Sequence, residues 1–426
     1  MKYILRLFPE ISIKSRPVRN YLTKMVCRNL LNVAGRHGLK VNARWEWDKV
    51  LAEFVDATAE QAATELSRLP GVHSFTAVHA YPFETLEDLY EAVHPRSGPA
   101  ITGRLFCVRV RRHGQHPFNS QQAERYLGAR FAEDYKPAGV DLDAPEVTIR
   151  LTLDRQTAYL EGERQPGLGG FPVGSQGRVL ALVSGGFDSG VAAYLALRRG
   201  CRVDYLFFNL GGLEHELGVM RECRMLWERF GASHRVRFVA VPFEETVGQI
   251  LERTHHGVRG VLLKRAMMRV GALLAQRLKC GALVTGESLG QVSSQTLENL
   301  GHIDAAAGML VIRPLELWDK QDIIREAERL GTAKLAESMP EYCGVISDHP
   351  NVCPSAEFIA AEDAKLDPEL ASRAAHAAQI LDITELEVES SLAEVPTLED
   401  LPDGAVVLDV RAPDASTRHP LSLADH

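Results

Sequence analysis

The sequence predicts an α/β protein of several domains, in which small α+β modules precede a doubly wound parallel sheet. The 426 residues leave room for about three domains at roughly 150 residues each. Before residue 165, strand and helix patterns mix within short stretches, whereas from residue 178 short apolar strands alternate regularly with helices. The composition, 45% hydrophobic and 24% charged, is that of a globular protein.

The first module is predicted at residues 1–75. Its β-α-β order within so few residues indicates a small α+β sheet, and the helix predicted at 17–35 is amphipathic and basic. The strands are expected at 2–7, 50–54 and 71–80, and the helices at 17–35 and 60–69.

The second module is predicted at residues 76–165. RLFCVRVR (104–111) alternates apolar and basic residues, as a half-buried strand does. Helices are expected at 84–94 and 119–132, with further strands at 147–153 and 157–160. The stretch 162–177 is dense in glycine and proline and predicts a linker, which we place at 166–177.

The third module is predicted at residues 178–395. Its alternation of short strands and helices is the rhythm of a doubly wound sheet, followed by acidic helices at 355–397. Strands are expected at 178–183, 203–208, 236–241, 282–285 and 310–312, and helices at 190–199, 217–230, 244–255, 260–278 and 320–330. A last strand at 405–410 begins a unit that this sequence does not complete.

The net charge of −8 is unevenly distributed. Residues 1–170 hold 23 basic and 20 acidic side chains, residues 171–360 hold 21 of each, and residues 361–426 hold 4 and 15. A negative average argues against nucleic-acid binding. However, the first 45 residues carry ten basic groups against Glu10 alone, so the average does not exclude such a role for the N-terminal third.

Nothing in the sequence predicts a membrane protein. No uncharged apolar run reaches about 18 residues, and the first residues carry charges and no cleavage site. Seven scattered cysteines without a CxxC pair indicate a reducing compartment and argue against structural zinc. We therefore expect a cytoplasmic protein.

The strongest motif is Ser184-Gly-Gly-Phe-Asp-Ser189, between an apolar strand and a helix. Backbone amides of such a turn and a helix N-terminus cradle phosphate oxygens. The two serines add hydroxyl donors, and Asp188 is a candidate Mg²⁺ ligand. The Walker A and GxGxxG patterns are both absent. The alternative is an ordinary strand–turn–helix that needs its glycines for the turn.

This loop resembles that of the PP-loop ATP pyrophosphatases, which attack the α-phosphate of ATP, release pyrophosphate and leave an adenylated intermediate. The resemblance implies that Ser184, Gly185, Gly186, Asp188 and Ser189 bind pyrophosphate and its Mg²⁺. It also implies that Leu182, Val183, Phe207 and Phe208 line the adenosine pocket.

Four further segments bear on function. The cations Lys264 and Arg265 could neutralise phosphates, and residues 285–296 follow a strand at the sheet edge where α/β proteins bind ligands. Lys320 opens a helix, where a cation adds little helix stability, which favours a phosphate-facing role. Cys343 stands in a polar loop, where a thiol can become a persulfide or form a disulfide.

Together SGGFDS, GESLGQVSSQT, the Asp319-Lys320 helix start and MPEYCGVIS resemble the tRNA 4-thiouridine synthetases, or tRNA sulfurtransferases of thiamine biosynthesis, over residues 1–410. The resemblance implies a ferredoxin-like domain, a THUMP domain and a PP-loop domain. It implies that ATP adenylates uridine at position eight of tRNA, and that persulfide sulfur then displaces AMP. The basic residues expected to contact RNA are Lys14, Arg19, Arg109, Arg111 and Arg112.

The same resemblance assigns individual roles. Nucleotide contacts fall on Leu182, Val183, Lys264, Gly286 and Gln295, with Arg265 beside them. Asp188 and Lys320 match positions that the activity requires, and Cys343 matches a cysteine that forms a disulfide with the persulfide cysteine. The implied cofactors are ATP and Mg²⁺. The implied partners are tRNA, a cysteine desulfurase, the sulfur-carrier protein of thiamine biosynthesis and a second copy of the chain.

Residues 396–426 depart from this pattern. They look like the opening of a rhodanese domain, but the sequence stops before the loop that would carry the persulfide cysteine, which suggests truncation or a degraded domain. Two alternatives therefore stay open. One is a tRNA-binding PP-loop protein without complete sulfurtransferase activity, and the other is a different PP-loop adenylating enzyme.

Overall fold

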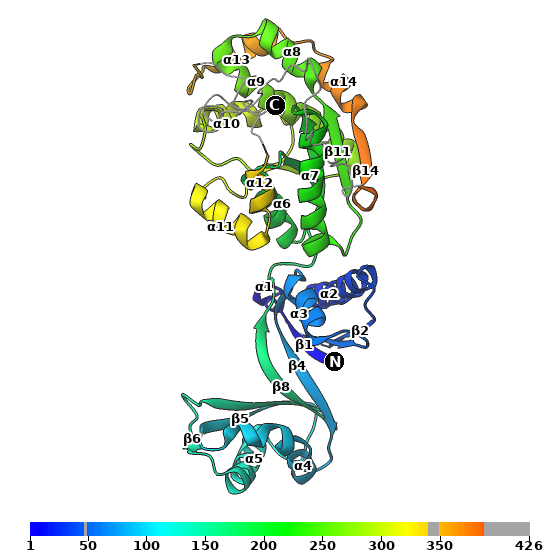
Figure 1. Cartoon of the computed structure of the whole chain (residues 1–426), viewed down its shortest axis with the longest axis vertical. Helices are drawn as coiled ribbons and strands as arrows, with labels where there is room; N and C mark the ends of the chain where they lie inside the picture. The colour runs from blue at the N-terminus through cyan, green and yellow to red at the C-terminus, as the bar shows by residue number, and fades with distance from the viewer. Residues whose placement is uncertain (47–48, 340–348, 387–426) are drawn as a thin grey trace, which may run out of the picture. The chain divides into compact units, whose positions relative to one another are not determined.

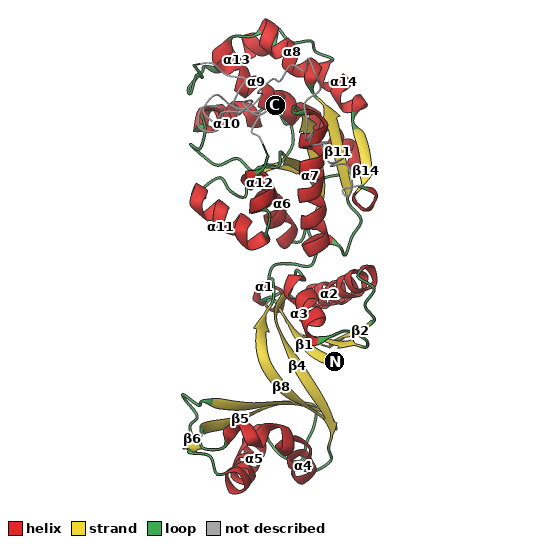
Figure 2. Ribbon diagram, in the orientation of Figure 1, coloured by secondary structure: helices red, strands yellow, loops and turns green. Residues whose placement is uncertain are grey.

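Two β-sheets and their covering helices make up the part of the chain that the computed structural model describes, residues 1–46, 49–339 and 349–386. The first sheet has eight strands in the order β2-β3-β1-β4-β8-β7-β5-β6. The second has six in the order β13-β12-β9-β10-β11-β14. Figure 1 labels these elements, and Figure 2 separates strands from helices by colour.

The N-terminal half of the first sheet packs against three helices. Tyr3, Leu5 and Leu7 face these helices, so the alternate residues of the same strand lie on the opposite face. The strands are β1 (Lys2–Leu7), β2 (Val41–Glu46), β3 (Lys49–Phe54) and β4 (Val72–Pro82), and the helices are α1 (Pro9–Ser12), α2 (Arg16–Arg36) and α3 (Ala59–Arg68). The strand β2 and the short α1 were not predicted.

The other half of the sheet packs against α4 (Leu86–Ser97) and α5 (Ser120–Tyr135). Capping boxes at Thr85 and Asn119 fix where these helices begin. In each box the side chain of the first residue accepts the backbone N–H of the residue three positions on, Asp88 or Gln122, whose side chain accepts the backbone N–H of the first. The strands are β5 (Leu105–His113), β6 (Gly139–Val140), β7 (Val147–Asp154) and β8 (Thr157–Pro166).

The two halves share the long strands β4 and β8, visible as the paired arrows in Figure 2. The boundary placed between residues 75 and 76 falls inside β4. The linker expectation for 162–166 is wrong, because β8 continues to Pro166 and pairs Gln165 with Phe75. Gly162 and Pro166 suggested a loop, but pairing with β4 holds this stretch extended.

The second sheet is parallel in β9 (Arg178–Val183), β10 (Arg202–Asn209), β11 (Arg237–Pro242), β12 (Ala282–Val284) and β13 (Val311–Ile312). The strand β14 (Gln379–Asp382) adds to it antiparallel. The expectation of helices throughout 355–397 is therefore wrong at β14. It holds for α13 (Ala356–Asp363) and α14 (Leu370–Ala377).

Helices cover both faces of this sheet (Figure 1). One face packs against α8 (Glu244–Arg253), α9 (Arg259–Leu278), α10 (Leu297–Asp304), α13 and α14. The other carries α6 (Phe187–Arg198) and α7 (Gly212–Leu226), with α11 (Lys320–Leu330) and α12 (Ala333–Glu337) against α6. After β9 the chain adds β10 on one side of β9, and it later adds β12 on the other side of β9. The strand order therefore reverses between β9 and β12, which is a topological switch point.

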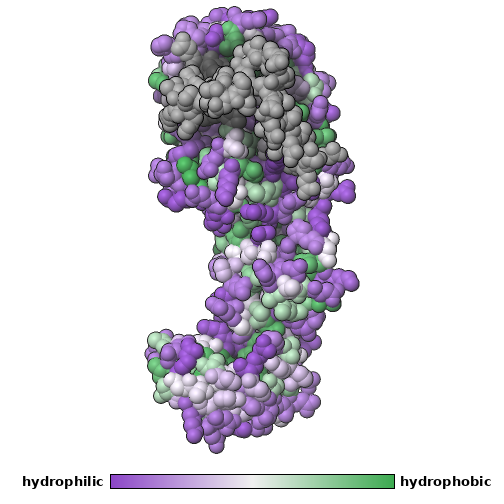
Figure 3. Space-filling view, viewed as in Figure 1, coloured by the Kyte–Doolittle hydropathy of each residue, from purple (hydrophilic) through white to green (hydrophobic). Residues whose placement is uncertain are grey.

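Outside the grey atoms, hydrophilic residues predominate on the face drawn in Figure 3. Within the described residues, no helix has both the length and the apolar character needed to cross a bilayer.

Candidate functional site

A pocket of about 440 Å³ opens at this switch point, beyond the carboxyl ends of β9 and β12. Ligands of open α/β sheets bind at such positions because the loops that leave the strands diverge there. The predicted site residues that line the pocket are Leu182, Val183, Ser184, Gly186, Asp188, Ser189, Phe208, Lys264, Gly286, Gln295 and Lys320.

The structure does not bring Phe207 and Arg265 to the pocket lining. Phe207 alternates with Phe208 along β10, so its ring faces the other side of the sheet and packs against His215 and Phe238. Arg265 follows Lys264 on α9 but points elsewhere, to the carboxylate of Asp363 and a backbone carbonyl. The direction of a side chain changes from one residue to the next in a strand or a helix, so these two point away from the pocket that their neighbours line.

The loop after β9 is held together by its own hydroxyls. The Ser184 backbone N–H donates to Ser189 Oγ at 3.2 Å, and Ser189 Oγ donates to the Gly186 carbonyl at 3.1 Å. His215 of α7, a pocket residue that was not predicted, donates from Nε2 to the Ser184 carbonyl at 2.9 Å. Hydrogen bonds within the loop and one from α7 thus hold the loop that leads into α6.

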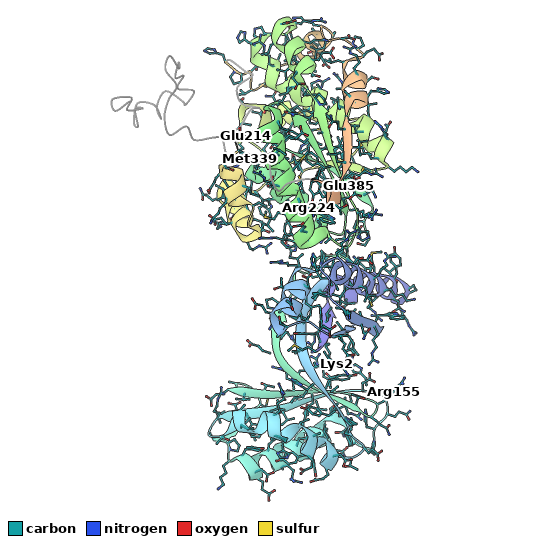
Figure 4. The ribbon with its side chains drawn as sticks, turned by 45° about the vertical axis from the view of Figure 1, so that its right-hand side comes forward. Lys2, Arg155, Glu214, Arg224, Met339 and Glu385 are labelled. Carbon is teal, nitrogen blue, oxygen red and sulfur yellow. The ribbon has the colours of Figure 1, made fainter. Side chains whose placement is uncertain are left out.

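Two glycines allow the close packing of this loop. Gly185 has φ +82°, and a Cβ there would collide with Met339 Sδ, although Gly185 itself does not line the pocket. A Cβ on Gly286 would stand 2.7 Å from the Ser189 backbone nitrogen. Met339, labelled in Figure 4, also lies against Gly218 of α7.

Asp188 and Lys320 form an ion pair at the edge of the pocket. Lys320 Nζ lies 2.6 Å from Asp188 Oδ1, and Gln291 Nε2 donates to Asp188 Oδ2 at 2.8 Å. Lys320 is the first residue of α11, as the sequence predicted, but Asp319 makes no side-chain capping bond. Three segments distant in sequence therefore meet at one carboxylate.

A buried ion triad contributes two of its members, Lys264 and Glu287, to the pocket lining. Glu287 Oε1 lies 3.0 Å from Lys264 Nζ, Glu287 Oε2 lies 2.9 Å from Arg313 Nε, and Thr285 Oγ1 donates to Oε2 at 3.1 Å. Burial raises the pKa of Glu287, but Lys264 and Arg313 lower it by more, so that the carboxyl stays ionised. Lys264 therefore lines the pocket while its ammonium group is in an ion pair with Glu287. Neither Glu287 nor Arg313 was predicted as a site residue.

Glu222 of α7 is a buried carboxyl next to the first turns of α6. A Cβ on Gly190 would collide with its oxygen, and neither carboxyl oxygen has a hydrogen-bond partner among the described residues. Burial raises the pKa of Glu222 to about 8. The group is therefore mostly protonated at neutral pH and adds no negative charge beside α6.

Part of the pocket lining is apolar. Phe208 and Leu182 line it with Met267 and Met268 of α9, and the Phe208 ring lies 4.6 Å from that of Phe243. An apolar wall next to a polar phosphate-type loop suits a ligand with a flat ring and an anionic tail.

A second feature is a group of arginines on the face of the eight-stranded sheet that lies opposite α2 and α5. Partial burial, together with the charges of Arg6, Arg111 and Arg150, lowers the pKa of Arg164. Arg6 also pairs with Glu161 at 2.7 Å. We call Arg6, Arg111, Arg150 and Arg164 the arginine face. Of these four, only Arg111 was predicted to contact RNA.

The other predicted RNA contacts are dispersed. Arg109 shares the strand face of Arg111 and donates to the Leu142 carbonyl at 2.5 Å. Arg112 lies over the Phe118 ring, 5.9 Å from its centroid, on the helix side. Lys14 is exposed after α1, and Arg19 in α2 donates to the Ser12 carbonyl at 3.3 Å.

The predicted sulfur-transfer elements lie outside the described residues. These are Cys343 and the rhodanese-like segment 396–426. The described cysteines are free thiols, all buried except Cys353.

Family models match two parts of the chain. A model described as Thiamine biosynthesis protein (ThiI) matches residues 174–367, and the THUMP domain model matches residues 83–161. The first range contains the pocket, and the second contains most of the sheet half that includes Arg111 and Arg150.

Solved structures share the fold. A crystal structure described as a 4-thiouridine synthetase–RNA complex with bound ATP has a TM-score of 0.78 at 23% identity, covering 89% of this chain and 99% of that one. A Pyrococcus horikoshii structure has a TM-score of 0.58 at 18% identity, covering 78% and 99%.

Curated relatives match along almost the full chain. A tRNA sulfurtransferase of Shewanella amazonensis is 45% identical over 99% of this chain and 88% of its own length. One from Psychromonas ingrahamii is 44% identical with the same coverage. With a common fold and this identity from end to end, the chain belongs to the tRNA sulfurtransferase family.

Proposed function

We propose that this chain is an ATP-dependent tRNA sulfurtransferase that adenylates uridine eight of tRNA and replaces its O4 with sulfur. The observation that carries the proposal is the Asp188–Lys320 pair beside a glycine-rich loop in a pocket with a partly apolar lining. Family membership and the ATP and RNA of the structural neighbour support it.

The chain's own groups suit adenylation. In the proposal the apolar wall at Phe208 holds the adenine, and the loop amides with Ser184 and Ser189 bind the two leaving phosphates. Lys264 and Lys320 stabilise negative charge that develops as the bond to pyrophosphate breaks. Lys264 and the two serines need little rearrangement, because Glu287 and the hydrogen bonds within the loop already hold them.

The reaction divides a difficult substitution into two steps. Uracil O4 attacks the α-phosphorus, pyrophosphate leaves, and N3 loses its proton. The terminal sulfur of a persulfide then attacks C4, the C4–O bond breaks, and AMP leaves. In the proposal the Cys343 thiolate attacks the carrier sulfur of the resulting mixed disulfide, which forms a protein disulfide and releases 4-thiouridine.

The residues at Asp188 fit Mg²⁺. This ion prefers oxygen ligands and commonly uses one or two carboxylates together with substrate phosphates. Asp188 supplies such a carboxylate beside the phosphate-type loop, and the described residues contain no cluster of three or more His, Cys, Asp or Glu that would form an all-protein site. When bound, Mg²⁺ would neutralise phosphate charge.

Further parts of the proposal rest on the family. A cysteine desulfurase would supply the persulfide sulfur, and the sulfur-carrier protein of thiamine biosynthesis would be a second acceptor. The family model named for thiamine biosynthesis supports that branch. A cytoplasmic location and a homodimer belong to the same proposal.

The test is pyrophosphate release from labelled ATP by the wild-type chain. We expect unmodified tRNA to stimulate release and fully thiolated tRNA not to stimulate it. Equal release with and without tRNA would reject the adenylation of tRNA.

For tRNA binding, we propose that the arginine face contacts phosphates. Arg6 pairs with Glu161, and the same carboxylate acts on the charges of Arg111 and Arg164, so one negative charge is shared and much of the positive charge is available to an anion. Two residues of the arginine face, Arg111 and Arg150, lie within residues 83–161, which the THUMP domain model matches, and this supports the proposal.

Replacing Arg111 and Arg150 with alanine should weaken tRNA binding and make it less dependent on salt. Each neutralised phosphate releases counterions, so the slope of log K against log salt should fall by about 1 for each phosphate that is no longer bound. Filter binding at several salt concentrations measures the slope. Replacing the exposed Arg253 and Arg277 of α8 and α9 with alanine is the matched control, because it removes the same charge away from the arginine face. Equal slopes for the arginine-face variant and the control would contradict the prediction.

A further inference from the structure

Both oxygens of the Asp188 carboxylate are engaged, one by a charged group and one by a neutral amide. Lys320 Nζ donates to Asp188 Oδ1 at 2.6 Å, and Gln291 Nε2 donates to Asp188 Oδ2 at 2.8 Å. We propose that Gln291 is a positioning residue that fixes the orientation of the Asp188 carboxylate. The inference rests on the proposed function, in which Asp188 serves the Mg²⁺-bound phosphates.

The orientation of the Gln291 amide follows from chemistry. An ionised carboxylate only accepts hydrogen bonds, so the NH₂ group faces Asp188 and Oε1 points away. Oε1 is buried, and no described residue bonds to it. A buried acceptor without a partner lowers stability. The hydrogen bond to Asp188 thus holds the NH₂ group in this orientation although Oε1 has no partner among the described residues.

The backbone around Gln291 is held rigidly. Gly290 has φ +77° and donates to the Gln295 carbonyl at 2.8 Å, and the Gln291 N–H donates to the Ser288 carbonyl at 3.3 Å. The Leu289 N–H donates to the Glu316 carbonyl at 2.9 Å. A side chain on such a fixed turn can hold its partner in a defined orientation.

The two contacts of Asp188 have different consequences when phosphates enter the pocket. The Lys320 ammonium is attracted to a phosphate and can leave Oδ1, because its side chain is 42% exposed and flexible. The neutral Gln291 amide has no such competitor and keeps Oδ2. Gln291 thereby prevents rotation of the carboxylate and leaves Oδ1 as the oxygen available to a cation.

Gln291→Met removes the donor while it preserves side-chain length. ATP binding is measured by isothermal titration at stepped Mg²⁺ concentrations, together with tRNA-stimulated pyrophosphate release. The half-saturating Mg²⁺ concentration should rise about tenfold, in keeping with the removal of one hydrogen bond to a charged group. At saturating Mg²⁺, ATP affinity should return close to the wild-type value, which a general structural defect would not produce.

Gln379→Met is the control, because Gln379 is an exposed glutamine of the same domain. Gln291→Ala serves as a second variant should the methionine pack badly. A Mg²⁺ dependence equal to that of the wild type in a folded Gln291 variant would overturn the proposal. Wild type without tRNA-stimulated release would instead reject the proposed function, while the Mg²⁺ titration of ATP binding still tests Gln291.

Discussion

Asp188→Asn should lower tRNA-stimulated pyrophosphate release by about 10³-fold with little change in folding. The substitution keeps the size of the side chain but removes the charge that pairs with Lys320 at 2.6 Å. It also removes the carboxylate proposed to serve Mg²⁺. Single-turnover release of labelled pyrophosphate measures the effect, and far-UV circular dichroism checks the fold.

Asp322→Asn is the matched control for this variant. Asp322 lies on the first turn of α11 and pairs with Arg325, and its side chain is 49% exposed. Its removal should leave release within about twofold of wild type, because exposed ion pairs contribute little. A double variant that adds Lys320→Met to Asp188→Asn should be hardly slower than Asp188→Asn alone, since groups that act as a unit are not additive. Near-normal release by Asp188→Asn would refute the assignment of this site.

Glu287→Gln should lower the free energy of unfolding of the ATPase region by about 3 to 5 kcal/mol. The amide leaves Lys264 and Arg313 buried without their shared counter-charge, and side-chain exposure of Glu287 is only 7%. Urea unfolding followed by tryptophan fluorescence and circular dichroism measures the destabilisation. The variant should also bind ATP more weakly, because Lys264 no longer has the partner that directs it.

The same destabilisation should depend on pH. The pKa of Glu287 in the folded chain is lowered, because Lys264 and Arg313 outweigh burial. A depressed carboxyl pKa contributes stability above the unfolded value of about 4.5, and this contribution disappears as the pH falls through the folded value. The difference between wild type and Glu287→Gln should therefore shrink below about pH 4.5.

Glu228→Gln is the control for stability. Glu228 pairs with Arg224 on the surface, where its side chain is 48% exposed, and its removal should cost no more than about 0.5 kcal/mol. Similar destabilisation by both variants, or a destabilisation that is constant across pH, would contradict the role given to the buried triad.

Local patterns predicted much of the framework. The strand at 178–183 was found with those bounds as β9, and the helix beginning at Lys320 was found as α11. Both depend on strong local signals, namely an apolar run before a glycine-rich turn and a helical period after an N-cap position. Weak local signals failed, as with β14, whose strand character comes from pairing with β11.

Side-chain direction separated correct from incorrect expectations within adjacent pairs. Phe208 and Lys264 line the pocket, whereas their neighbours Phe207 and Arg265 do not. A strand alternates its faces, and a helix turns by about 100° per residue, so the direction of a side chain changes from one residue to the next. The sequence predicted that each pair lies near the pocket. Which member of the pair faces the pocket depends on which helix covers which face of the sheet.

The sequence by itself determined the chemical type of the site. A strand, a glycine-rich turn and a helix present free backbone amides that suit a phosphate wherever that local geometry forms. Only the tertiary structure decided the partners of Asp188, since Gln291 and Lys320 lie 103 and 132 residues away in the chain. Such contacts require the switch point between β9 and β12, which brings three distant loops to one edge.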